Sequence, residues 1–206
     1  MFSRRIAIFF SAAVLTLASG FASAETTAPD QLIKQVSTEV LDALRADKSI
    51  KTGDVQKIIA LVDAKVMPHV NFQRMTSSAV GRYWRQATPE QQKRLQDEFK
   101  VLLVRTYSGA LAQVKDQTVQ LKPSRPGSDP NEVVVKTEIR GQGDPIQLDY
   151  RLEKSSGDWK IYDVNVLGVW LVENYRNTFA QEIGANGIDG LIAKMAERNK
   201  AAATRS

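Results

Sequence analysis

The chain has 206 residues, a formal net charge of +5 and no cysteine. The missing cysteine excludes disulfides, thiolate catalysis and thiolate metal sites. The charge is mild and forms no concentrated basic stripe, which argues against a nucleic-acid binder. A chain of this length has room for one substantial domain.

The first 24 residues have the pattern of a secretory signal peptide. Arg4 and Arg5 precede an apolar run from Ile6 to Leu17, and the small-x-small pattern that signal peptidase accepts ends at Ala24. We therefore expect residues 1–24 to be removed and residues 25–206 to form the mature protein in the periplasm of a Gram-negative bacterium. Because Arg4 and Arg5 leave, 26 basic residues then face 23 acidic ones, a net charge of +3.

Helical periodicity dominates residues 28–115. Apolar residues repeat at intervals of three and four along residues 30–46, where Asp30 is the expected N-cap. A second amphipathic helix is expected from Thr52, and Pro68 ends its pattern.

Two further helix starts have clear capping signals. Asn71 can cap a short third helix that ends near Gly81. The residues from Thr88 to Gln91 predict the start of a long helix, because Thr88 can act as N-cap and Gln91 can complete a capping box.

After Gln117 the pattern changes from helix to strand. Four strands are expected near residues 119–121, 132–140, 146–152 and 159–166. In the third strand charged residues alternate with apolar ones at Ile146, Leu148, Tyr150 and Leu152. Short connections indicate an antiparallel meander over about 117–167 that helices must cover. The expected fold class is α+β, a four-stranded antiparallel sheet packed with several helices.

The stretch from Trp159 to Arg176 changes its hydrophobic period at Gly168. Before Gly168 it reads as a strand with Tyr162, Val164 and Val166 on one face and with Trp159 and Ile161 on the other. After it, we expect helices over about 168–200, rich in aromatic residues and broken at residues 184–187. A strand that is apolar on both faces needs cover on both, so something apolar is expected to be enclosed here.

The sequence has few candidates for catalysis. His69 is the single histidine, and its place beside Pro68 predicts a capping or surface role. Asp149 and Asp163 could form an acid/base pair if their strands brought them together, but charge pairing across the strands explains Asp149 equally well. We predict no catalytic residue, no metal site and no cofactor other than a bound cargo.

Basic residues gather around two aromatic ones, Tyr83 and Trp84. Their positions allow two interpretations: a site for lipid phosphate or an acidic partner, or a solvated helix face whose arginines cover the rings. The residues concerned are Arg74, Arg82, Arg85, Lys93 and Arg94.

Four segments in this order resemble the MlaC family of periplasmic phospholipid-binding proteins, also called toluene-tolerance proteins. They are Pro68 to Trp84, the helix from Thr88 through Tyr107, Trp159 to Arg176, and Gly187 to Leu191. The resemblance implies an NTF2-like sheet and a helical part that together enclose an apolar pocket for the acyl tails of a phospholipid. It also implies shuttling between an inner-membrane ABC transporter complex with an MCE-domain subunit and an outer-membrane lipoprotein–porin complex, which maintains outer-membrane lipid asymmetry.

Periodicity and this resemblance together predict the lipid-binding residues. From the sheet we expect Ile146, Leu148, Tyr150, Leu152, Tyr162, Val164 and Val166. From the helical segments we expect Phe72, Met75, Phe99, Leu102, Leu103, Tyr107, Val169, Trp170, Leu171, Tyr175 and Phe179.

Two other functions remain open at this point. An NTF2-like enzyme would need an acid/base group inside its pocket, so finding Asp149 and Asp163 both on the outer face of the sheet would remove its best candidates. An exported adaptor with an ordinary filled core would bind no ligand. The sequence has no coiled-coil heptad that demands assembly, and we expect a monomer.

Overall fold

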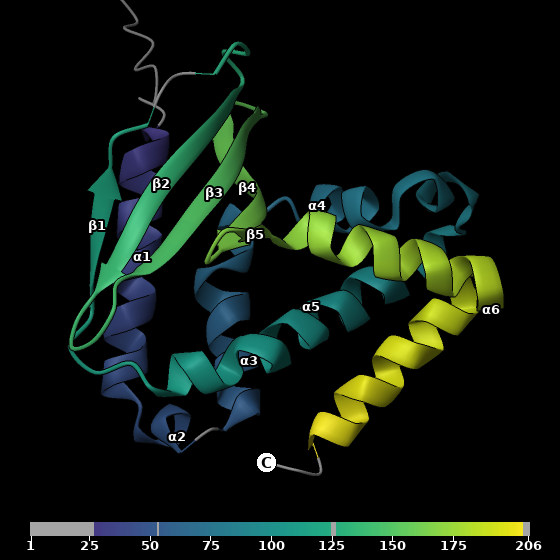
Figure 1. Ribbon diagram of the computed structural model, residues 1–206, viewed down its shortest axis with the longest axis horizontal. Helices are drawn as coiled ribbons and strands as arrows, with labels where there is room; N and C mark the ends of the chain where they lie inside the picture. Colours follow the sequence, from purple (N-terminus) through teal and green to yellow (C-terminus); the bar gives the residue numbers. More distant parts are fainter. Residues whose placement is uncertain (1–26, 53, 125–126, 204–206) are drawn as a thin grey trace, which may run out of the picture.

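The computed structural model describes residues 27–52, 54–124 and 127–203, so the predicted signal peptide lies outside the described part. Helices pack against one face of an antiparallel sheet and extend from it to one side (Figure 1). Among the described helices, none combines the length and apolar character that a membrane crossing requires.

Helices form the first and last parts of the described chain. The first part contains α1 (Pro29–Ala46), α2 (Lys48–Lys51), α3 (Val55–Lys65), the 3₁₀ helix η1 (Met67–His69), α4 (Phe72–Val80), the 3₁₀ helix η2 (Gly81–Gln86) and α5 (Pro89–Ala112). The last part is α6 (Leu171–Ala203), whose φ and ψ at Gly187 are 73° and 179°. This conformation breaks α6 at the end of the predicted breaker, residues 184–187.

Local capping signals explain where several helices begin. The predicted N-cap roles of Asn71 and Thr88 are confirmed, and Thr88 forms the complete capping box. Two other expectations were wrong. Asp30 lies inside the first turn of α1, and α3, which was expected from Thr52, begins at Val55 with Asp54 as its N-cap.

The sheet has five strands in sequence order, and all neighbours are antiparallel. The predicted strands are β1 (Thr118–Lys122), β2 (Glu132–Arg140), β3 (Ile146–Ser155) and β4 (Asp158–Val166). The expected total of four was wrong, because the two-residue strand β5 (Val169–Trp170) pairs with the end of β4. Two residues are too few to give an alternating pattern in the sequence.

A β-bulge at Tyr162 changes the faces of β4. Asp163 pairs with Arg151, whereas Leu152 pairs with Ile161, so Tyr162 is the extra residue. Ile161 therefore shares the inner face of the sheet, the face that carries Leu152 and packs on α1. Tyr162 lies on the opposite, outer face, and the prediction that it shares a face with Val164 and Val166 was wrong.

The apolar interior is divided into three clusters. The α4–α6 cluster comprises Met75, Ala79, Val80, Ala87, Leu95, Phe99, Leu102, Val172, Phe179, Ile183, Leu191, Ile192 and Met195. The sheet cluster comprises Leu32, Ile33, Val36, Val135, Leu152 and Ile161. The α2–α3 cluster, which also includes one residue each from α1 and α5, comprises Leu44, Ile50, Ile58 and Val104.

Candidate functional site

Some of the predicted lipid-binding residues are buried in the apolar interior. Phe99 is completely buried, and its ring centroid lies 5.0 Å from that of Tyr175 and 5.2 Å from that of Phe179. Such edge-on aromatic contacts fill space efficiently. The fully buried members of the predicted set are Met75, Phe99, Leu102, Leu152, Leu171 and Phe179.

A second group of the predicted residues is apolar and half-buried. Its members come from α4, α5, α6 and the inner face of the sheet: Phe72, Leu103, Tyr107, Leu148, Tyr150, Val164, Val166 and Tyr175. Val164 packs against both the α4–α6 cluster and the sheet cluster, so the two meet at this part of β4. Of the others, Phe72, Leu103 and Tyr175 pack against the α4–α6 cluster and Tyr150 packs against the sheet cluster.

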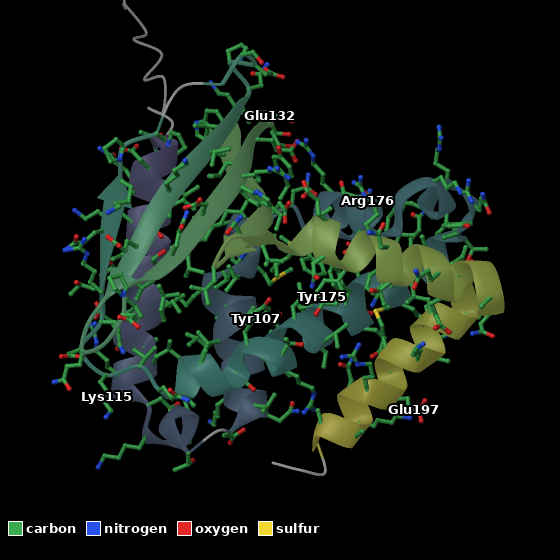
Figure 2. The ribbon with its side chains drawn as sticks, in the orientation of Figure 1. Tyr107, Lys115, Glu132, Tyr175, Arg176 and Glu197 are labelled. Atoms are coloured by element: carbon green, nitrogen blue, oxygen red, sulfur yellow. The ribbon has the colours of Figure 1, made fainter. Side chains whose placement is uncertain are left out.

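Two tyrosines come together where α5 passes α6. Tyr107 and Tyr175 lie near one another in the middle of the molecule, below β5 in the view (Figure 2). Burial raises the pKa of the Tyr107 hydroxyl, and the nearby Tyr175 raises it further. The Tyr107 hydroxyl therefore stays protonated at neutral pH and can serve as a neutral hydrogen-bonding group.

Tyr150, on β3, has an unusual environment. Burial raises the pKa of its hydroxyl, while the hydroxyls of Ser37 and Thr137 lower it. Part of the Tyr150 side chain nevertheless remains accessible. The Tyr150 hydroxyl is thus buried, although the residue as a whole is only half-buried.

The structure does not bring Tyr162 and Trp170 together with the others. The guanidinium carbon of Arg74 lies 3.6 Å from the ring centroid of Tyr162, and that of Arg151 lies 4.0 Å from the Trp170 ring. Trp170 also belongs to β5 and pairs with Asn165, rather than to the helix in which it was expected. Both aromatic residues therefore lie on the outer face. The remaining predicted residues, Ile146 and Val169, are exposed at the end of the sheet.

Two residues between the clusters were missing from the predicted set. Val40 packs against the sheet cluster and the α2–α3 cluster, and Val70 packs against the sheet cluster and the α4–α6 cluster. Val40 belongs to the apolar stripe of α1, so periodicity could have found it. Val70 lies between η1 and α4 and forms an isolated bridge with Ile161, which leaves no periodic signal.

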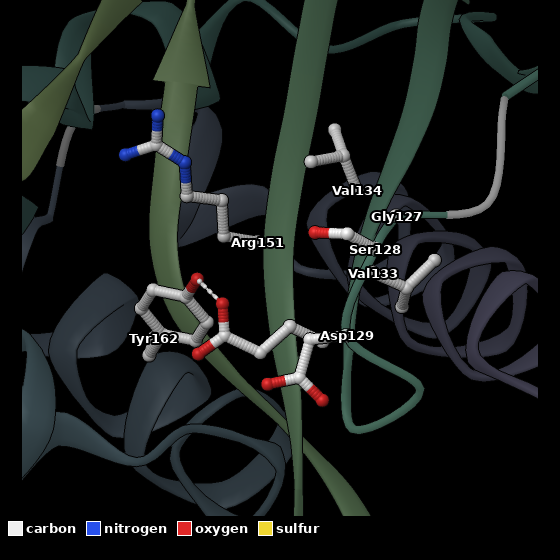
Figure 3. Close-up of a pocket in the computed structure, with 8 residues that line it drawn as sticks. Gly127, Ser128, Asp129, Val133, Val134, Arg151 and Tyr162 are labelled. Carbon is white, nitrogen blue, oxygen red and sulfur yellow. Dashed lines mark hydrogen bonds between the residues drawn. The ribbon is translucent and has the colours of Figure 1, made fainter.

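A small pocket opens on the outer face (Figure 3). Its volume is about 200 Å³, and its lining residues are Gly127, Ser128, Asp129, Glu132, Val133, Val134, Arg151 and Tyr162. The Tyr162 hydroxyl donates a hydrogen bond of 3.1 Å to Glu132 across it. Ligand pockets usually have about 300–1,000 Å³ and a largely apolar lining. A small pocket with charged side chains is unsuited to acyl tails.

The two candidate acid/base residues both lie on the outer face. Asp149 pairs with Lys136 across β2 and β3, and Asp163 pairs with Arg151 across β3 and β4. Asp163 is 1% exposed, accepts hydrogen bonds from the backbone N–H groups of Val172 and Val164, and forms an ion pair with Arg151. Asp163 thus has a structural role.

Within the described ranges, no three histidine, cysteine, aspartate or glutamate residues could hold a metal ion. His69 ends η1, and burial lowers the pKa of its imidazole. His69 is half-buried at a helix end, and its expected capping or surface role stays a prediction.

The basic residues near Tyr83 and Trp84 do not converge on one point. Arg74 turns to the sheet, where it pairs with Glu132 and Glu153. Lys93 pairs with Asp97 one helical turn away. Arg82 stacks on Tyr83, 4.9 Å from the ring centroid. The arrangement favours the solvated helix face.

Comparisons with known proteins agree on one family. A family model described as MlaC protein matches residues 34–197. The intermembrane phospholipid transport system binding protein MlaC of Haemophilus influenzae is 27% identical over 173 residues, covering 82% of this chain and 81% of the relative. A toluene tolerance protein of Pseudomonas putida is 28% identical over 182 residues, covering 84% of each chain.

A solved structure gives the same result. The phospholipid-binding protein from Ralstonia solanacearum, in complex with a phospholipid, is 46% identical and superimposes with a TM-score of 0.81, covering 84% of this chain and 98% of that chain. Since the family model spans most of the sequence and the fold agrees with that of a relative, this chain belongs to the MlaC family.

Proposed function

We propose that the protein is a periplasmic phospholipid carrier. The acyl tails of the bound phospholipid would lie between the inner face of the sheet and helices α4, α5 and α6. Its cargo would move between the outer and inner membranes and so maintain outer-membrane lipid asymmetry. Its partners would be an inner-membrane ABC transporter complex with an MCE-domain subunit and an outer-membrane lipoprotein–porin complex. Binding and transport of phospholipid agree with the names of the relatives.

The observation that carries this proposal is a set of apolar side chains that stay half-buried where the apolar clusters meet. A domain usually has one contiguous core with smaller satellite clusters, and here the clusters are joined by side chains that remain partly accessible, such as Val40, Val70 and Val164. The accessible part of Tyr150, deep in the protein, is expected if that side chain borders an internal space. A space with this lining suits hydrocarbon.

Energetics explain why a carrier is needed. Two acyl tails together contain about 30 methylenes, and each methylene that moves from the bilayer into water costs roughly 0.8 kcal/mol, or about 24 kcal/mol in total. Unaided escape from a bilayer is therefore very slow. A pocket lined by leucine, valine and tyrosine can replace the bilayer without holding the lipid irreversibly.

We further propose that the protein is not an enzyme. An acid/base mechanism would require an acid/base group inside the pocket, and its best candidates, Asp149 and Asp163, both lie on the outer face. The relatives are also named for binding or transport of phospholipid rather than for a reaction. The half-buried apolar side chains between the clusters argue against an adaptor with a filled core.

The direct test is mass spectrometry of an organic extract of the purified protein. We expect phospholipid in near-stoichiometric amount. A blocking variant, Val166→Trp, places a bulky ring on the inner face beside Leu148 and should reduce the bound lipid. The matched control, Val134→Trp, places the same ring on the outer face and should leave the lipid content unchanged. A wild-type protein that extracts clean, and takes up no lipid from vesicles, would refute the proposal.

A further inference from the structure

The tight turn between β4 and β5 has an unusual residue at its first central position. Val166 pairs with Val169, so the central residues are Leu167 and Gly168, whose φ angles are 52° and 90°. A two-residue turn with positive φ at both positions normally has asparagine before the glycine, because the left-handed conformation crowds the Cβ of most side chains. Leu167 is therefore strained.

Leu167 is also poorly placed with respect to water. Among the described residues, Leu167 is the most exposed large hydrophobic side chain, at 66%. The fold gains little from a leucine that is both strained and exposed. Backbone outliers of this kind are concentrated at sites where the side chain has a function.

The turn ends an apolar track on the inner face of the sheet. Paired residues in an antiparallel sheet share a face, and here the successive pairs are Tyr150 with Val164, Leu148 with Val166, and Val166 with Val169. Exposure increases along the track, from half-buried Tyr150 and Leu148 to 49% at Val169. The track thus leads from the interior to the surface.

The outer end of the track is broadened by β3. Ile146 follows Leu148 on the inner face and is 40% exposed. The backbone N–H of Leu167 donates a hydrogen bond of 3.1 Å to the carbonyl oxygen of Gln147, which holds the turn beside Ile146. In Figure 1, β5 lies at the edge of the sheet next to the start of α6. Ile146, Leu167 and Val169 together form the apolar rim.

We propose that the apolar rim is the lip over which the acyl tails of a phospholipid enter and leave the protein, and that Leu167 contacts the tails in transit. This inference rests on the proposed lipid carriage. A tail that leaves the pocket exposes methylenes to water before it reaches the next apolar environment. An apolar lip covers part of the tail at this stage, so it lowers the barrier to transfer without contributing to the bound state.

The test compares Leu167→Asn with the wild type in the transfer of a fluorescent phospholipid from loaded protein to phosphatidylethanolamine–phosphatidylglycerol vesicles. We expect the transfer rate to fall roughly fivefold or more, because a polar side chain no longer covers the tail in the transition state. Bound lipid at equilibrium should be unchanged. The Tm should rise by roughly 2–4 °C, because asparagine relieves the strain at positive φ.

Two control variants separate the apolar contact from other effects. Leu167→Met keeps an apolar side chain and should transfer lipid at the wild-type rate. Leu121→Asn makes the same chemical change on β1, at a leucine that is 36% exposed, and should also leave the rate unchanged.

The outcomes distinguish this inference from the proposed function. If the loaded Leu167→Asn variant transfers lipid at the wild-type rate, the role of Leu167 is overturned while lipid carriage stands. The same holds if its transfer is slower but its Tm is also lower than that of the wild type. Equal slowing by Leu167→Met or by Leu121→Asn overturns it as well. A wild-type protein that cannot be loaded overturns the carrier function itself.

Discussion

Asp163 on β4 and Val172 in the first turn of α6 are joined by a hydrogen bond of 3.1 Å, in which the Val172 N–H donates to a carboxylate oxygen. The same oxygen accepts from the Val164 N–H at 2.9 Å, and the other oxygen lies 3.1 Å from Arg151. A carboxylate at a helix N-terminus satisfies a free N–H and interacts favourably with the helix dipole. The sheet therefore determines where α6 begins.

Removing the Asp163 carboxylate should destabilise the fold. We expect Asp163→Ala to lower the free energy of unfolding by about 2–4 kcal/mol, because buried N–H groups and Arg151 lose their partner. Asp163→Asn keeps one acceptor oxygen and should cost about 1 kcal/mol or less. Denaturant unfolding measures both. Equal losses for the two variants would contradict the capping role.

The same residue should affect the pH dependence of stability. Burial raises the pKa of Asp163 above its ordinary value of 3.8, although its hydrogen bonds to Val172 and Val164 and the charge of Arg151 oppose the shift. A carboxyl whose pKa is higher in the folded state binds its proton more tightly there. Its contribution to stability is therefore complete below pH 3.8 and is lost as the pH rises through the folded-state pKa.

Asp163→Asn cannot titrate at this position, so it isolates this contribution. We expect the wild type to gain stability relative to Asp163→Asn as the pH falls from about 7 to about 4. Denaturant unfolding of both proteins across this range gives the difference. A difference that stays constant or shrinks towards acid pH would exclude the raised pKa.

Arg74 holds two like charges together. Glu132 and Glu153 are direct cross-strand partners, an arrangement that is unfavourable for two carboxylates. One guanidinium nitrogen of Arg74 lies 2.6 Å from Glu132, and another pairs with Glu153. We expect Arg74→Ala to lower the free energy of unfolding by about 1–3 kcal/mol. The double variant Arg74→Ala/Glu132→Gln should recover part of this loss in denaturant unfolding, and no recovery would refute the bridging role.

Adjacent leucines on α5 distinguish core from pocket. Leu102 is 5% exposed, whereas Leu103 is half-buried. In delipidated protein, Leu102→Ala should cost about 2–4 kcal/mol and Leu103→Ala about 1 kcal/mol, because a side chain that borders a space leaves little new cavity. Leu103→Ala should also alter the amount of phospholipid extracted from the purified protein, whereas a substitution at an exposed residue should not. Equal costs and unchanged lipid would place Leu103 in the ordinary core.

The break in α6 depends on glycine. At Gly187, φ is 73° and ψ is 179°, a combination that is accessible almost only to glycine. We expect Gly187→Ala to lower the free energy of unfolding by about 1–3 kcal/mol. The control, Gly184→Ala, lies three residues earlier with open space around its Cβ and should stabilise by about 0.5–1 kcal/mol. Thermal unfolding of both variants tests the contrast, and a neutral Gly187→Ala would disprove the strain.

Elements that depend on local chemistry could be predicted from the sequence. Asn71 and Thr88 were recognised as N-caps because capping involves residues within one helical turn. The four longer strands were recognised because β-branched and alternating residues are local signals. Their antiparallel order followed from short connections.

The positions of Tyr162 and Trp170 depend on strand pairing rather than on the residues next to them. The face of Tyr162 is set by the register between β4 and Arg151 on β3, and that of Trp170 by its pairing with Asn165. Neither register leaves a signal in the residues next to it. For the same reason, Asp163 could be recognised as a charged strand residue but not as the cap of a helix that begins eight positions later.

The bulge at Tyr162 limits where β4 can be joined in a chimera of two related proteins. Before the bulge, odd-numbered residues such as Trp159 and Ile161 face inward, and after it even-numbered ones such as Val164 and Val166 do so. A chimera joined within residues 161–163 with one residue too few would turn half of its β4 inside out. Crossovers in this strand should therefore be placed outside the bulge, where parental spacing is preserved on both sides.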